Sequence, residues 1–347
     1  MAKKEIHNEY SMLDYSALKT SGLDHIVAGA VEDSVARFDS ADDAAVFFAR
    51  ELDHVKAKTY DRKYPKLTAL AVFPRTSEID AGAETMTYYS YDKTGVAKII
   101  SNYATDLPRA DVQGKPTTVQ IKSLGDSYGY SVQEMRASRL AGKSLDARKG
   151  EAARSLIENL TNKIAWAGDN DTGLIGVLST ENDIPVYTAA NNAKGTSTKF
   201  KDKTPDEILE EVSDWYQYIA KLTSDVEVPD TLCVPPDVYI YLSTTRLPHT
   251  DTTIKKFLLE NLTELKDIVR APELADNATE TNPYAKDGQN VAFLFTNDEE
   301  KLALEVPLDF TQYPVQVKGL ESIINCEQRV AGVIVYYPFS ALIIPGI

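Results

Sequence analysis

Two strand-forming stretches separated by a polar segment constrain the fold of this chain more than any other feature. They read TMTYYSYDKTG over residues 85–95 and TTVQIKSLGDSYGYSV over residues 117–132. Residues 84–124 contain no stretch with helical periodicity, and the intervening ATDLPRADVQGKP is turn-like and polar. This pattern predicts a long two-stranded hairpin. Because an isolated ribbon buries too little apolar surface to offset its conformational entropy, the hairpin must draw stability from another surface.

The alternation of apolar residues changes parity within the second stretch. Val119 and Ile121 alternate with polar residues, and Tyr128 and Tyr130 then follow with the opposite parity. A one-residue change of this kind moves the apolar side chains to the other face of a strand. The sequence therefore predicts a bulge or bend near Gly125.

Residues 144–169 give the strongest helical pattern in the chain. Ser144 is suited to the N-cap position, and Gly168 is suited to end the helix. Apolar residues recur on one stripe, which we expect to pack against the core. The predicted core residues on this stripe are Leu145, Ala152, Leu156, Leu160 and Ile164.

A second helix is predicted over residues 204–222, where Thr204 and Glu207 form a capping box ahead of an apolar stripe. Short strand-like and helical segments then alternate as far as residue 306, and long strands return after it. Helices and strands mixed in this way predict an α+β fold.

Two apolar segments are interpreted as buried strands. KLTALAVFP, residues 66–74, is a short apolar run that ends at a proline. The segment at residues 330–347 is nearly as long as a membrane span, but Pro338 and Pro345 interrupt it and β-branched residues dominate. We therefore expect two buried strands there and no membrane partner.

Composition and motifs argue against several functional classes. The chain has 37 basic and 52 acidic residues, a formal net charge of −15, so phosphate backbones repel it as a whole. Its four histidines lack metal-ligand spacing, and the sequence contains no nucleophile elbow or phosphate-binding loop. Cys233 and Cys326 sit beside apolar residues, as buried free thiols do. We therefore expect no catalytic residue, no cofactor and no metal.

Several segments, taken in order, resemble the major capsid proteins of tailed bacteriophages, which have the Hong Kong 97-type fold. They are YDKTGVAKIISNYATDLPRADV in the hairpin region, YGYSVQEMRAS and LDARKGEAARSLIENLTNKIAWAGDNDTGLIGVL around the long helix, and LDFTQYPVQVKGLESIINCEQRVAGVIVYYP near the C-terminal end. None of these segments is a catalytic motif, so the resemblance depends on several matches in the same order. It covers most of the chain from residue 44 onward.

The resemblance implies a division of the chain into an arm, an extended loop, a peripheral domain with a long spine helix, and an axial domain. The implied segments are an N-terminal arm at 1–40, a first peripheral-domain segment at 41–80, the extended loop at 81–122, a second peripheral-domain segment with the spine helix at 123–188, the axial domain at 189–305, returning peripheral strands at 306–332, and a C-terminal axial strand at 333–347.

In this fold the extended loop lies over a neighbouring subunit, so the resemblance implies which residues contact another copy of the chain. The implied intersubunit residues are Met86, Tyr88, Tyr89, Tyr91, Ile99 and Tyr103, and the implied core of the spine helix is Leu156, Leu160 and Ile164. Some capsids of this fold also form lysine–asparagine isopeptide links. Lys93, Lys98 and Asn325 lie in broadly suitable segments, although an ordinary surface role is the simpler interpretation.

The function that the resemblance implies is structural and not enzymatic. The chain would self-assemble, as hexamers and pentamers, into an icosahedral head that encloses double-stranded phage DNA without sequence specificity. Scaffolding, portal and decoration proteins are further implied partners. The implied location is the virion capsid, assembled in the cytoplasm of the bacterial host.

Two alternatives remain open at the level of sequence. An encapsulin-like nanocompartment shell shares the fold but encloses protein cargo, so the contents of the particle distinguish the two. A soluble hydrolase that uses surface carboxylates is the remote alternative, because acidic pairs alone are a weak signal of an active site.

Overall fold

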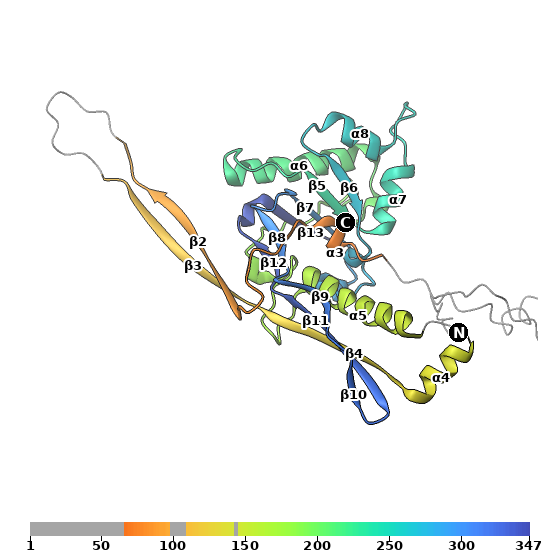
Figure 1. Ribbon diagram of the computed structural model, residues 1–347. Helices are drawn as coiled ribbons and strands as arrows, with labels where there is room; N and C mark the ends of the chain where they lie inside the picture. The colour runs from red at the N-terminus through yellow and green to blue at the C-terminus, as the bar shows by residue number, and fades with distance from the viewer. Residues whose placement is uncertain (1–65, 98–108, 142–144) are drawn as a thin grey trace, which may run out of the picture. The chain divides into compact units, whose positions relative to one another are not determined.

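The computed structural model describes residues 66–97, 109–141 and 145–347 (Figure 1). The helices are α3 (Ala69–Val72), α4 (Val132–Ala141), α5 (Leu145–Ala167), α6 (Pro205–Thr223), α7 (Pro236–Thr244) and α8 (Ile254–Asn261). The predicted arm at 1–40 lies outside the described residues.

Thirteen strands form four separate sheets within the described residues. The strands are β1 (Arg75–Thr76), β2 (Thr85–Thr94), β3 (Asp111–Gln120), β4 (Lys122–Ser131), β5 (Thr231–Val234), β6 (Asp267–Arg270), β7 (Val291–Phe295), β8 (Leu302–Glu305), β9 (Leu308–Gln312), β10 (Gln316–Lys318), β11 (Glu321–Val330), β12 (Gly332–Val335) and β13 (Ala341–Pro345). Helices and sheets occur together as predicted.

A four-stranded sheet with the order β13-β7-β5-β6, here called the mixed sheet, carries apolar side chains on both faces. Leu232, Leu294 and Leu342 pack with residues of α6, α7 and α8 on one face. Phe293 and Phe295 pack on the other face with Trp166 from the end of α5. Because both faces are covered, β7 reads VAFLF, a continuous apolar run in which all five residues are buried.

A second sheet, here called the long sheet, pairs β4 with β11 over ten residue pairs and adds β10 and β9 to β11. Only alternate residues of β11 are fully buried, from Ile324 to Val330. Helix α5 covers this face, where Ile157 packs with Leu124 and Ile324. The alternation is typical of a sheet that packs on one side only.

The buried face of α5 differs from the predicted one. Ile164 is 2% exposed, as predicted, but Leu156 is 61% exposed and Leu160 is 43% exposed. Ile157 and Ala153 occupy the core positions instead. The prediction that Leu156 and Leu160 form the spine-helix core of this chain is therefore wrong.

The physical reason lies in the rotation of the helix. Each residue turns by about 100°, so a run of steps of four drifts by about 40° per step. Leu156 therefore lies about 80° around the helix from Ile164, whereas Ile157 lies only about 20° from it. A stripe that alternates steps of three and four stays on the core, and a pure step of four does not.

The predicted strand at 66–74 is also wrong in type, although its burial is correct. Ala69–Val72 form the short helix α3, in which Ala69 and Val72 are buried. The preceding residue anchors this turn, because Thr68 donates from its backbone N–H (3.1 Å) and its hydroxyl (2.5 Å) to the carboxylate of Glu273. A four-residue apolar run cannot reveal this long-range partner.

Helix α6 begins at the predicted capping box. The Thr204 hydroxyl accepts from the Glu207 N–H, and the Glu207 carboxylate accepts from the Thr204 N–H at 2.6 Å. We expect Thr204→Ala to lower the free energy of unfolding by about 1 kcal/mol. Thr204→Ser keeps the hydroxyl and should stay near the parent value. Urea unfolding of both variants checks this, and equal losses would contradict the capping role.

Candidate functional site: the two-stranded hairpin

Strands β2 and β3 run side by side and form a sheet of their own (Figure 1). Their ten residue pairs extend from Thr85↔Gln120 to Thr94↔Asp111, a length of roughly 30 Å. Within the described regions of the chain, no third strand pairs with either of them. The predicted hairpin is therefore present, with two free edges along its length. Its second strand begins at Asp111, inside the segment 104–116 that the sequence pattern indicated as a turn, so that part of the prediction is wrong.

The root of the hairpin, defined as Thr85–Tyr88 of β2 with Thr117–Gln120 of β3, packs on its own chain. Val119 is 2% exposed, and the neighbouring Ile121 is 3% exposed. The root cluster contains buried Val119, Ile121, Ala331 and Ile334, with half-buried Ile79, Ala83, Met86, Tyr88, Ile175 and Tyr336 against them. Met86 and Tyr88, which the resemblance implies as intersubunit residues, therefore pack against this cluster of their own chain in the single subunit.

The change of parity in the sequence marks the point where the chain leaves the hairpin. Ile121 alone separates β3 from β4, and its N–H donates to the Glu84 carbonyl at 2.9 Å. Beyond it, Leu124 packs into the core under α5. Strand β4 keeps a regular register with β11 through Gly125, so a change of sheet near Ile121, and not a bulge at Gly125, produces the observed pattern.

The outer half of the hairpin, defined as Tyr89–Thr94 with Asp111–Pro116, is exposed at every described side chain. Tyr89 is 62% exposed and Tyr91 is 70% exposed, and their rings stack at a centroid distance of 6.4 Å. Tyr91 is paired with Gly114, and a Cβ there would lie 2.9 Å from the ring. Glycine at this position lets the ring lie across the neighbouring strand. The stacked pair therefore presents two exposed aromatic rings on one face of the outer half.

The remaining hairpin residues predicted to contact another subunit, Ile99 and Tyr103, lie outside the described residues. The same holds for Lys98, one of the two lysines considered for an isopeptide link. Lys93 lies on β2 in the outer half, and Asn325 lies on β11.

A buried acidic residue, which the sequence analysis missed, lies beside the root cluster. Glu305, at the end of β8, is 3% exposed, and its Oε1 accepts a 2.7 Å hydrogen bond from the Tyr336 hydroxyl. Its Oε2 is buried without a hydrogen-bond partner among the described residues. The Tyr336 ring contacts the Tyr88 ring edge to face, at 5.0 Å between centroids. Glu305 is thus connected to the hairpin through two tyrosines.

Burial raises the pKa of Glu305 above its ordinary carboxyl value, and the charge of nearby Glu78 raises it further, whereas the hydrogen bond from Tyr336 opposes the shift. The folded state therefore holds this proton more tightly than the unfolded state. The contribution of this proton to the free energy of unfolding is fully present below the ordinary carboxyl pKa. It is lost as the pH rises through the raised pKa of the folded state.

We expect Glu305→Gln to remove this component of the pH dependence, because the amide stays uncharged at every pH. The unfolding free energy of the parent, relative to the variant, should fall as the pH rises above the carboxyl range. Thermal unfolding across a pH series measures this difference, with Glu321→Gln, an exposed carboxyl on β11, as the matched control. Parallel profiles for parent and Glu305→Gln would contradict the assignment.

Other exposed apolar side chains lie on α5 and on the β10–β11 hairpin. Besides Leu156 and Leu160, Val317 is 74% exposed and Leu320 is 66% exposed. The exposure of Val317 and Leu320 follows from the pairing of β10 with the edge of β11. The spacing of residues 316–321 in the sequence does not predict it.

No group of three or more His, Cys, Asp or Glu side chains in the described regions could hold a metal ion. None of the helices in the described segments combines the length and apolarity needed to span a membrane. Cys233 and Cys326 are buried free thiols, as predicted.

Comparisons with known proteins agree on the family and the fold. The family model described as "Major capsid protein" matches residues 95–347. A search of curated protein sequences found no match. Among solved structures, the capsid of Myoviridae phage XM1 superposes with a TM-score of 0.72 at 16% identity, covering 88% of this chain and 100% of that one.

Two further structures extend the likeness of the fold. Mycobacterium phage Ogopogo gives a TM-score of 0.57 at 13% identity, covering 84% of this chain and 96% of that chain. The capsid of an empty GTA particle gives 0.57 at 11% identity, covering 85% and 94%. The α+β fold is thus the Hong Kong 97-type fold of phage capsids. The chain belongs to the major capsid protein family, and it is a structural subunit of a capsid and not an enzyme.

Proposed function

We propose that this chain assembles as hexamers and pentamers into the icosahedral head of a tailed bacteriophage, and that the outer half of its hairpin contacts a neighbouring subunit. The stacked Tyr89–Tyr91 pair carries this proposal, because both rings are exposed and neither is among the side chains that pack on the root cluster. Aromatic rings that are exposed on a single subunit are typical of the surface that becomes buried at the centre of a protein interface.

The root and the outer half of the hairpin have different roles in this proposal. The root cluster fixes the hairpin to its own subunit through Val119, Ile121 and Tyr88. The outer half then carries Tyr89 and Tyr91 beyond the body of the subunit, where a second copy would cover them. Its two unpaired edges would also be covered, which removes the risk of aggregation through pairing of free strand edges.

The proposed content of the head is double-stranded DNA, held without sequence specificity. The net charge of −15 supports this, because a strongly acidic shell protein does not adhere to phosphate. Scaffolding, portal and decoration proteins are proposed as further partners. Assembly is proposed to occur in the cytoplasm of the bacterial host.

Electron microscopy and light scattering of the purified full-length protein test the proposal. We expect closed shells or rings of subunits, in which hexamers and pentamers are visible by class averaging. A compact 38.3 kDa monomer at every salt and protein concentration would contradict it. Particles from producing cells should protect DNA from nuclease, whereas a co-purifying enzyme in place of DNA would favour an encapsulin-like compartment.

A further inference from the structure

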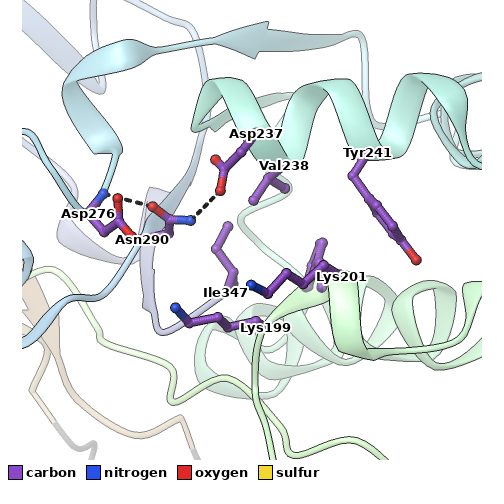
Figure 2. Close-up of a pocket in the computed structure, with 9 residues that line it drawn as sticks. Lys199, Lys201, Asp237, Val238, Tyr241, Asp276, Asn290 and Ile347 are labelled. Atoms are coloured by element: carbon purple, nitrogen blue, oxygen red, sulfur yellow. Dashed lines mark hydrogen bonds between the residues drawn. The ribbon is translucent and has the colours of Figure 1, made fainter. Parts of the chain in front are cut away.

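A cavity of about 160 Å³ lies between α7 and the segment that faces it (Figure 2). Phe200, Val238 and Ile347, each at most 5% exposed, form the apolar part of its wall. The Tyr241 ring completes this wall, and its hydroxyl donates to the Lys203 carbonyl at 3.3 Å, which fixes the ring in place. A cavity of about 150 Å³ with apolar walls binds benzene. The apolar space therefore has room for one aromatic ring.

Two carboxylates at the rim of this cavity are positioned by one buried amide. Asn290 is 5% exposed, and its side-chain Nδ2 donates to the Asp237 carboxylate at 2.9 Å. Its Oδ1 accepts from the backbone N–H of Asp276 at 2.8 Å (Figure 2). Both aspartates are exposed, and neither forms an ion pair with a residue that the structure describes. The rim therefore has two carboxylates available to a cation.

Two ammonium groups come to the same rim from the opposite segment. Lys199 precedes the short 3-10 helix η2 (Phe200–Asp202), and Lys201 lies within it, so they flank the phenylalanine of the apolar wall (Figure 2). Both lysines are exposed, and within the described part of the chain neither has an ion-pair partner. The apolar space is thus bordered by two unpaired charges of each sign.

We propose that this cavity binds a free aromatic amino acid, with its ring against the apolar wall. The α-ammonium group faces Asp237 and Asp276. The α-carboxylate faces Lys199 and Lys201. A ligand with one charge would leave two rim groups of the other sign without a partner, and a ligand without a ring would leave the apolar wall in contact with water. This inference goes beyond the proposed function, because every lining residue belongs to a single subunit.

The ring and the charges contribute to binding in different ways. Burial of the ring removes apolar surface from water, so it supplies most of the affinity. The rim charges are exposed and therefore screened by water and salt, so each contributes less. They select the ligand, because they require an ammonium and a carboxylate group on the same small molecule.

Saturation-transfer NMR of the full-length protein with L-phenylalanine tests the proposal. We expect saturable binding with a dissociation constant of about 1 mM or lower, and more saturation on the ring protons than on the α proton. L-Alanine, which keeps both charges and lacks the ring, should bind at least about tenfold more weakly. Phenethylamine and 3-phenylpropionate each lack one charge and should bind about fivefold more weakly. Absence of saturable L-phenylalanine binding would overturn the proposal, and equal affinity for either singly charged compound would do the same.

Substitution of the rim lysines locates the ligand. Lys199→Ala/Lys201→Ala should weaken L-phenylalanine binding about fivefold and should not weaken the binding of phenethylamine, which has no carboxylate. Lys194→Ala, an exposed lysine outside the cavity, is the matched control and should leave both affinities unchanged. All three side chains are exposed, so the thermal unfolding midpoint should stay at the parent value. Unchanged binding in the double variant, or an equal loss in the control, would place the ligand elsewhere and overturn the proposal.

A substitution that fills the cavity tests the site of the ring. Val238→Phe should abolish L-phenylalanine binding, because the new side chain occupies the apolar space, and full binding by this variant in its folded state would contradict the proposal. The exposed lysine variants decide the outcome independently of whether Val238→Phe folds. Particles that form normally from a protein that binds no amino acid would overturn this inference and leave the proposed function standing. Binding by a protein that forms no particles would do the reverse.

Discussion

An Ile157→Asp variant is expected to give no folded protein. Ile157 is 3% exposed and packs between α5 and the long sheet with Leu124 and Ile324. An unpaired carboxylate in this position costs several kcal/mol, which is comparable to the whole stability of a typical domain. Soluble yield and far-UV circular dichroism after expression measure the effect.

The matched control is the neighbouring residue on the same helix. Leu156 is 61% exposed, so Leu156→Asp places its charge in water and should leave the unfolding midpoint within a few degrees of the parent. Assembly is the property that this variant tests, because an exposed leucine on α5 is suited to contact another molecule. Equal loss of folded protein from both substitutions would show that the face of α5 is assigned wrongly.

Removal of the outer half of the hairpin is expected to abolish stable particles while the subunit stays folded. Replacing residues 89–116 with a short Gly/Ser linker leaves the root pair Tyr88↔Thr117 and the root cluster intact. Removing one such intersubunit interaction costs about 1–2 kcal/mol, roughly the contribution of an aromatic cluster. A closed shell repeats that interaction in every subunit, so the total destabilisation is large.

Thermal unfolding and particle yield, compared with the parent, separate the two effects. A Tyr89→Ser/Tyr91→Ser variant isolates the aromatic pair, and it should lower particle yield without a change in the unfolding midpoint. Intact particles from the truncated chain would contradict the intersubunit role. Unfolding of the truncated subunit would show that the outer half packs within its own chain.

The sequence predicts those elements whose signals are local. The capping box at Thr204, the glycine stop at Gly168 and the alternation around Val119 each depend on residues a few positions apart, and the structure contains the corresponding elements. The hairpin is predicted for the same reason. Its strands have no helical periodicity, and the segment between them is polar.

Features that depend on distant residues could not be predicted in this way. The helix at Ala69 depends on Glu273, about two hundred residues away, and the burial of Glu305 depends on strand pairing with β12. Gly332 is a further case, because a Cβ there would lie 2.1 Å from the Ile175 carbonyl oxygen. No local pattern reveals such a close approach of two backbones.

The two faces of α5 show a different limit. Apolar residues lie on several faces of this helix. Residue type alone therefore does not show whether Leu156 or Ile157 packs into the core. A capsid subunit buries surface twice, once in its own fold and once in the assembly. The sequence does not show whether an apolar residue is buried in the core of its own subunit or in a contact between subunits.

A density map of the assembled particle tests the central claim most directly, because it shows what covers the Tyr89–Tyr91 pair in place. The account predicts that both rings, exposed in the single subunit, are buried against a neighbouring copy of the chain in every hexamer and pentamer. A closed shell in which both rings face solvent, or fold back onto their own subunit, would contradict it.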